Sequence, residues 1–178
     1  MNTFLFPGMP INAPAKRSIF VSYHHGGDRS HYDAFSRLFT ARYELIYDNS
    51  VEREIDSDDP EYVIRKIREE YITGSSCTIV LCGAQTSWRK FVDWEIKATL
   101  DKEHGLIGVN LPSISTLPDG KFVVPDRLYD NIQSGYAVYT TWEDLTTDSN
   151  RLPTLIELAS NRRKQLIQNH RELRTRNG

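Results

Sequence analysis

Apolar residues along this chain follow two spacings that alternate with each other. Short continuous runs, rich in β-branched residues, predict strands that are buried on both faces. These runs span residues 18–23, 43–47, 77–82, 106–110 and 137–140. Between them, apolar residues three and four positions apart predict helices over residues 30–42, 59–73 and 88–102. Strand and helix therefore alternate along most of the chain.

This alternation favours a parallel sheet, because a parallel connection needs a crossover and a helix supplies it. The expected fold is an α/β three-layer sandwich: a flavodoxin-like, five-stranded parallel sheet in the order 2-1-3-4-5, with helices on both faces. Residues 111–135 are rich in Pro, Ser, Asp and Gly, which predicts an irregular insertion and a candidate lid. After Pro153 the pattern predicts a further helix that runs to Leu173 and packs over its first half only.

A chain of 178 residues is long enough for one domain with a sizeable core and too short for two ordinary ones. Residues 1–15 hold three prolines and no periodic pattern, which predicts a flexible N-terminal arm. Residues 16–145 are expected to form the main domain. Residues 146–178 are expected to form a C-terminal helical extension.

Charge is divided unevenly along the chain. The net charge of −2 conceals a basic C-terminal part, residues 151–178, which carries seven Lys/Arg and two Asp/Glu. A basic segment without interleaved aromatic residues is more often a solvated helix face or a subunit contact than a nucleic-acid site. We therefore expect no nucleic-acid partner.

Neither a membrane nor a metal is expected. No apolar run approaches the roughly 20 residues that cross a bilayer, and this favours the cytoplasm. Cys77 and Cys82 are five residues apart in one predicted strand, so their side chains point to opposite faces and make a poor disulfide or metal pair. The adjacent His24 and His25 make a poor metal pair for the same reason.

Ligands of an open parallel sheet bind beyond the carboxyl ends of its strands, where the strand order reverses. With the expected order, the loops after the first and third strands, residues 23–28 and 83–87, form this edge. Thr86 or Ser87 is placed to cap the next helix, whose free N–H groups would suit a phosphate. Capping alone is the simpler interpretation.

Glu95 is the candidate catalytic residue on that helix. It shares a stripe with Phe91 and Ala98 that is turned by about a quarter-turn from the core-facing stripe. A carboxylate among aromatic residues at the strand ends can orient ribose hydroxyls or stabilise an oxocarbenium ion. Helix position alone favours a surface glutamate paired with Lys102 or Arg89, so spacing by itself does not assign the role.

Three segments carry a family resemblance: residues 17–24 (RSIFVSYH), 77–83 (CTIVLCG) and 86–96 (TSWRKFVDWEI). Together they resemble the TIR-like proteins of the MTH538 type and, among these, the ThsB proteins of the bacterial Thoeris antiphage defence system. The resemblance covers about residues 16–112, and the stretch from Arg89 to Ile96 is its most specific part.

The resemblance implies an enzyme of the NAD nucleosidase or ADP-ribosyl cyclase type, with NAD as substrate and no separate cofactor. The family's catalytic glutamate falls on Glu95. Phe91 occupies a position that is often Trp in TIR enzymes. The expected nucleotide pocket is lined by Phe20, Ser22, Tyr23, His24, Gly83, Thr86, Ser87, Phe91 and Trp94. Asp48 and Asp93 are secondary candidates, and each fits a solvated carboxylate better.

The same resemblance implies partners. In ThsB-like members the product is a cyclic or conjugated ADP-ribose signal that activates a downstream effector. A role in defence implies a phage-derived trigger, because constitutive loss of NAD would poison the cell, and it allows a homo-oligomer.

Other functions stay open at this stage. A non-catalytic TIR-like interaction module shares the fold, and fold does not determine function. A nucleoside deoxyribosyltransferase-like enzyme also uses a glutamate to cleave an N-glycosidic bond on this kind of sheet. A phosphoacceptor receiver domain would need an acidic pair after the first strand, where this chain has His24 and His25.

Overall fold

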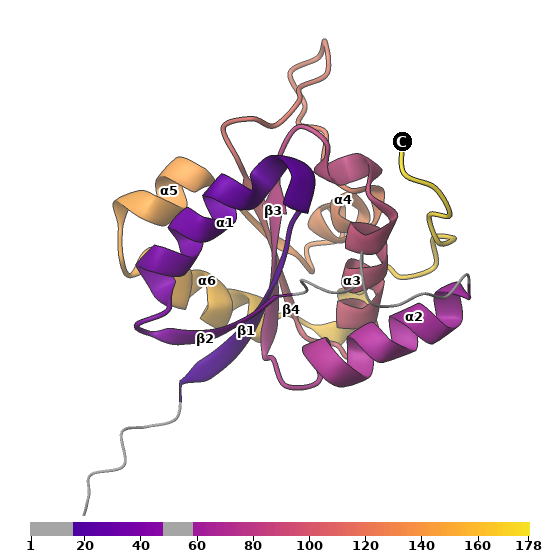
Figure 1. The fold of residues 1–178 in the computed structure, drawn as a ribbon, viewed down its shortest axis with the longest axis horizontal. Helices are drawn as coiled ribbons and strands as arrows, with labels where there is room; N and C mark the ends of the chain where they lie inside the picture. The colour runs from indigo at the N-terminus through magenta and orange to yellow at the C-terminus, as the bar shows by residue number, and fades with distance from the viewer. Residues whose placement is uncertain (1–15, 48–58) are drawn as a thin grey trace, which may run out of the picture.

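A five-stranded sheet forms the centre of the computed structural model, which describes residues 16–47 and 59–178 (Figure 1). Its strands are β1 (Arg17–Ser22), β2 (Tyr43–Tyr47), β3 (Cys77–Cys82), β4 (Gly105–Asn110) and β5 (Val138–Thr141). Neighbouring strands are all parallel, and their order is β2-β1-β3-β4-β5. The fold class and strand order predicted from the sequence are therefore confirmed. The expected N-terminal arm (residues 1–15) and Asp48 lie outside the described residues.

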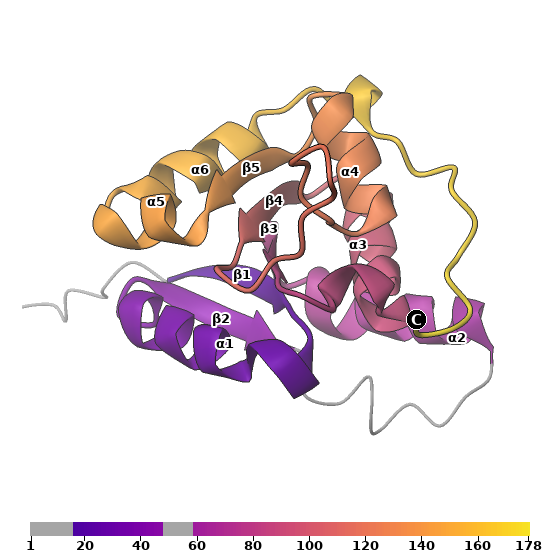
Figure 2. The same cartoon turned by 90° about the horizontal axis from the view of Figure 1, so that it is seen from above.

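Helices cover both faces of the sheet (Figure 2). One face carries α1 (His25–Phe39), α5 (Trp142–Thr147) and α6 (Arg151–Ser160). The other carries α2 (Pro60–Lys66), which continues into a π-helical turn (Ile67–Ile72), together with α3 (Lys90–Asp101) and α4 (Asp126–Gln133). Within the described ranges, none of these helices has the length and apolar character needed to cross a membrane.

Alternation along the strands divides the core between these two faces. On β1, Ile19 and Val21 pack toward α1, whereas Phe20 packs toward α2 and α3. Cys77 and Cys82 follow the same rule and join different clusters, as free buried thiols. Burial raises the pKa of the Cys77 thiol to about 12, so it stays protonated at neutral pH.

Helix α1 begins at His25, five residues before the predicted start at Ser30, so most of the expected loop after β1 is helical. Glycine at position 26 lets the backbone of this first turn pack closely against the His24 ring, because a Cβ on Gly26 would lie 3.0 Å from atoms of that ring. Asp28 places a carboxylate in the first turn, where it suits the helix dipole.

The sequence predicts an irregular insertion over residues 111–135, but part of this segment forms the helix α4. Only Arg127, Leu128 and Asn131 of this short helix are buried, so its polar composition concealed the helical pattern. The part before α4 projects beyond the carboxyl ends of the strands (Figure 1), and Thr116 and Phe122 form an antiparallel bridge within it. Its role as a lid stays a prediction.

The C-terminal helix α6 is present but ends at Ser160, well before the expected Leu173. Residues 161–178, here called the C-terminal strap, then run past α4 and α3 (Figure 2). Asn131 accepts from the Gln168 backbone N–H at 3.0 Å and donates to its carbonyl at 2.7 Å. Such tertiary hydrogen bonds occupy backbone groups that a longer helix would have bonded internally.

A buried ion pair fastens α4 to α3. Arg127 Nε donates to Asp93 Oδ1 at 2.9 Å, with the side chains 0% and 9% exposed. The backbone N–H of Arg174, in the strap, donates to Asp93 Oδ2 at 2.9 Å. Asp93 is therefore a buried, fully engaged carboxylate, and its interpretation as a solvated side chain is wrong, because the partner comes from a helix the sequence did not reveal.

Removing one member of this pair leaves an uncompensated buried charge. We therefore expect Arg127→Ala to lower the free energy of unfolding, measured by urea denaturation, by about 3–5 kcal/mol. Arg151→Ala is the control, since it breaks an exposed pair with Asp144, separated by 2.7 Å, and should cost less than about 1 kcal/mol. Equal losses in the two variants would contradict the anchoring role of Arg127.

Candidate functional site

The carboxyl ends of β1 and β3 lie side by side at the point where the strand order reverses. After β1 the chain passes to α1 on one face of the sheet. After β3 it passes through a short 3-10 turn (Thr86–Trp88) to α3 on the other face. This edge is where ligands of open parallel sheets bind.

Glu95 lies in the second turn of α3 and its side chain reaches β1. Ser22 Oγ donates a hydrogen bond to Glu95 Oε2 at 2.5 Å, and the two residues are 1% and 6% exposed. Ser22 is the last residue of β1 and lies on the strand face that carries Phe20. This hydrogen bond holds the carboxylate in one orientation. Glu95 is thus a buried side chain at the strand ends, not a surface glutamate.

One turn farther along α3, Thr99 joins the helix to the sheet. Its Oγ1 lies 2.7 Å from Thr78 Oγ1 on β3 and donates to the Glu95 carbonyl at 2.8 Å. Residues four apart share one helix face, so this contact and the Ser22–Glu95 hydrogen bond orient the same side of α3 toward the sheet.

Two aromatic residues flank the Glu95 position. Phe91 and Trp94 meet edge to face, with ring centroids 5.2 Å apart, and Lys90 Nζ lies 5.0 Å and 5.3 Å from their centroids. Trp94 is buried in the same cluster as Phe20, and its indole N–H donates to the Arg174 carbonyl at 2.9 Å. The structure therefore gathers Phe20, Ser22, Trp94 and Glu95 on one side of the sheet.

Tyr23 and His24, also predicted for the pocket, take different positions. The Tyr23 ring points to the opposite face and stacks on Tyr32 of α1, with centroids 4.6 Å apart. Its hydroxyl lies 3.2 Å from His25 Nδ1. The His24 ring is buried beside the first turn of α1. Tyr23 therefore packs on the α1 face of the sheet, whereas Glu95 belongs to α3, on the other face.

Asp28, in the first turn of α1, joins this helix to the segment after β3, a role that the sequence did not indicate. Thr86 Oγ1 donates to Asp28 Oδ2 and accepts from the Gly83 backbone N–H, both at 2.8 Å. Asp28 is 2% exposed, and its burial raises the pKa of the carboxyl, a shift that the Thr86 hydroxyl opposes in part. Gly83 is also required sterically, because a Cβ there would lie 2.0 Å from Asp28 Oδ1.

The sequence predicts that Thr86 or Ser87 caps α3, but neither residue does. The residue before this helix is Arg89, whose side chain makes no capping hydrogen bond, because the 3-10 turn displaces the helix start to Lys90. Thr86 binds Asp28 instead. Ser87 lines a cavity on the α4 side of α3, away from Ser22 and β1.

Asn110 adds a polar side chain that the sequence did not single out. It is the last residue of β4, is 4% exposed and accepts a hydrogen bond from the Tyr139 hydroxyl. Its Nδ2 has no hydrogen-bond partner among the described residues. A polar residue that ends a predicted buried strand was the available signal.

The Glu95 side chain is buried in this conformation, with the residue 6% exposed. Among the described residues, no group of three or more His, Cys, Asp or Glu side chains is arranged to hold a metal ion. The groups that the structure places at this edge include a buried carboxylate, its serine donor and neighbouring aromatic rings.

Comparison with known proteins adds the family. The family model described as Thoeris protein ThsB, TIR-like domain, matches residues 20–116, more than half of the chain. The chain belongs to this ThsB TIR-like family. The matched range contains both Ser22 and Glu95. No curated protein is similar enough to the sequence to count as a match.

Solved structures also match. One is titled "Structure of the activated Roq1 resistosome directly recognizing the pathogen effector XopQ (TIR domains)", with 14% sequence identity and a TM-score of 0.38. The match covers 55% of this chain and 58% of that chain, so it spans less than two thirds of the length of that structure.

The contact between Gly83 and Asp28 leads to a stability prediction. A methyl group at Gly83 must displace the buried Asp28 carboxylate, so Gly83→Ala should lower the free energy of unfolding by about 1–3 kcal/mol. Gly74→Ala is the matched control, because its Cβ would meet Ile46 Cδ1 at an ordinary 3.7 Å. Urea denaturation measures both, and a Gly83→Ala protein as stable as the control would show that this contact is not close.

Proposed function

We propose that this ThsB-family chain is an NAD-processing enzyme that cleaves the nicotinamide–ribose bond, with Glu95 as its catalytic residue. The product is an ADP-ribose signal, cyclic or conjugated, that activates a downstream effector in antiphage defence. The observation that carries the proposal is the buried Ser22–Glu95 hydrogen bond at the carboxyl ends of β1 and β3. Membership of the ThsB TIR-like family supports it.

Cleavage of this bond is favoured by a negative charge at a defined position. As the bond between the ribose C1′ and the pyridinium nitrogen breaks, its electron pair leaves with neutral nicotinamide and the ribose becomes an oxocarbenium ion. The Glu95 carboxylate opposes that positive charge, or orients the ribose hydroxyls. Water that adds to C1′ and loses a proton gives ADP-ribose, whereas an internal nucleophile of the substrate gives a cyclic isomer.

Ser22 acts in this proposal as a positioning residue. Its hydroxyl holds one oxygen of Glu95 from the end of a strand, a rigid support that costs no reorganisation during the reaction. Phe20 and Trp94, on the same side of the sheet, supply apolar surface next to the carboxylate. Phe91 is the half-buried ring available to stack on a base or on nicotinamide.

The direct test is Glu95→Gln, which keeps the shape of the side chain and its hydrogen-bonding atoms but removes the charge. If the charge acts mainly in the transition state, nicotinamide release from NAD should fall by about 10²–10³-fold. Glu143→Gln, an exposed residue on α5, is the control and should keep full activity. Near-normal NAD cleavage by Glu95→Gln would instead favour the non-catalytic interaction module.

A second variant tests the serine. Ser22→Ala removes the donor to Glu95 and should lower kcat by about tenfold, the usual value of a charge-assisted hydrogen bond, with a smaller change in KM. Ser18→Ala is a matched control, because Ser18 on the same strand donates to Glu44 Oε2 at 2.6 Å but is far from the site edge. Steady-state kinetics in which both variants behave alike would remove Ser22 from the mechanism.

Activity is proposed to depend on a trigger, of phage origin, or on assembly of several copies. The burial of Glu95 supports this, because a nucleotide reaches the carboxylate only after neighbouring side chains move. Dilute monomeric protein should therefore release nicotinamide slowly, and the rate per chain should rise with protein concentration. A constant, fast rate per chain across a dilution series would overturn this part of the proposal.

A further inference from the structure

Asp28 is a buried carboxylate near the carboxyl ends of β1 and β3 that the proposed reaction leaves without a role. It lies in the first turn of α1, shortly after Ser22 along the chain. Its burial raises the pKa of the carboxyl, because the charged form is less favourable there than in water. Buried carboxylates lower the stability of a fold unless their contacts compensate, and they are enriched at functional sites.

The partner of Asp28 is the hydroxyl of Thr86, whose direction is fixed from both sides. The hydroxyl oxygen accepts from the Gly83 N–H, and its proton is donated to Asp28 Oδ2. Thr86 is fully buried, so bulk water does not replace a partner that is lost. The contact therefore fixes the turn before α3 against the first turn of α1.

This contact and the Ser22–Glu95 hydrogen bond join the same two stretches of chain. One stretch runs from the end of β1 into α1 and contains Ser22 and Asp28. The other runs from the end of β3 into α3 and contains Thr86 and Glu95. A segment that is held at two separated points cannot pivot about either of them, so the second contact limits how α3 can move around the first.

Backbone hydrogen bonds connect the Asp28–Thr86 contact to the helix. The Arg89 N–H donates to the Thr86 carbonyl at 3.2 Å, and the Asp93 N–H donates to the Arg89 carbonyl, also at 3.2 Å. On the other side, the Asp28 N–H donates to the His24 carbonyl at 2.8 Å. A displacement of the Thr86 turn would therefore be passed to the first turns of α3.

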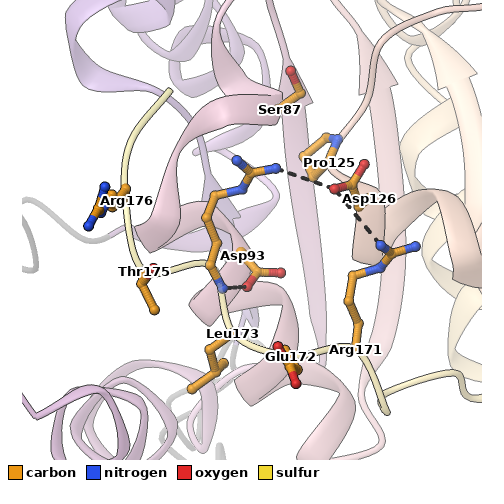
Figure 3. A pocket seen from close by; sticks show the side chains of 10 residues that line it. Ser87, Asp93, Pro125, Asp126, Arg171, Glu172, Leu173, Thr175 and Arg176 are labelled. Atoms are coloured by element: carbon orange, nitrogen blue, oxygen red, sulfur yellow. Dashed lines mark hydrogen bonds and ion pairs between the residues drawn. The ribbon is translucent and has the colours of Figure 1, made fainter.

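Helix α3 is held from its other side by different elements. Asp93 lies beside the C-terminal strap (Figure 3) and accepts from the Arg174 backbone N–H at 2.9 Å. The same carboxylate pairs with Arg127 of α4. The Asp28–Thr86 hydrogen bond opposes these contacts, because it holds the start of the helix from the side of α1.

Given the proposed function, on which this inference rests, we propose that Asp28 is a positioning residue that acts through Thr86 to hold Glu95 at the end of β1. Asp28 bonds the turn before α3 and not the substrate. Small displacements of a catalytic group lower the rate of the chemical step steeply. Loss of the contact should therefore lower kcat more than it weakens the binding of NAD.

The test is steady-state kinetics of nicotinamide release by the full chain at high concentration. Thr86→Val keeps the size of the side chain but removes its hydroxyl, and it should lower kcat by about tenfold with a smaller change in KM. Thr86→Ser keeps the hydroxyl and should retain most of the kcat of the parent. Asp28→Asn keeps an acceptor for Thr86 but loses the charge, and should lower kcat by about threefold.

Thr140→Val is the matched control. Thr140 is also buried, and its hydroxyl donates to the Asp144 carboxylate at 2.7 Å. It lies on β5, an edge strand that is separated from β1 by β3 and β4. This variant should keep the kcat of the parent.

A second background separates positioning from a general loss of structure. Glu95→Gln lacks the charge that the contact positions, so adding Thr86→Val to it should change the residual rate by less than about twofold. A purely structural contact would lower the residual rate by the same factor as in the parent, which overturns the proposal.

A kcat equal to that of the parent in both Thr86→Val and Asp28→Asn also overturns the role of Asp28, and it leaves the proposed function standing. A parent that releases no nicotinamide under these conditions overturns the proposed function, and the role of Asp28 with it. If Thr86→Val does not fold, Asp28→Asn is compared in the parent and in Glu95→Gln, and the same two outcomes decide.

Discussion

Three consecutive side chains of α3 are buried, and each must find a polar partner from a different part of the chain. Asp93 pairs with Arg127 of α4, the Trp94 indole donates to the strap, and Glu95 accepts from Ser22 of β1. A buried polar group without such a partner lowers the stability of the fold. These contacts therefore fix both the rotation of α3 about its axis and its distance from the sheet. The candidate site depends on that placement, because it aims Glu95 at the end of β1.

The need for partners from distant parts of the chain also explains why the sequence predicted more of the fold than of the site. Continuous apolar runs such as residues 77–82 indicate strands by themselves, and alternation with helices is enough to infer a parallel sheet and its order. Helix α4 and the strap lack that local signal. Arg127 and Asn131 are buried because distant residues satisfy them, and such pairings are invisible to periodicity.

The site residues were likewise predictable only in part. Spacing on α3 placed Glu95 next to Phe91 but favoured a surface role, and only the family resemblance indicated chemistry. Asp28 was missed because its partner Thr86 is 58 residues away. Tyr23 was expected to line the nucleotide pocket, and the period of two along β1 turns its ring toward Tyr32, on the face opposite to Ser22.

Product analysis tests the central claim, that the chain cleaves the nicotinamide–ribose bond, most directly. The full chain at high concentration, in an assembled or triggered state, would be incubated in parallel with NAD and with deoxynucleosides, and the products resolved by mass spectrometry. The account predicts equimolar nicotinamide and an ADP-ribose product, cyclic or conjugated, from NAD, and no free base from the deoxynucleosides. Release of base from deoxynucleosides with intact NAD would contradict it and assign the carboxylate to a deoxyribosyltransferase.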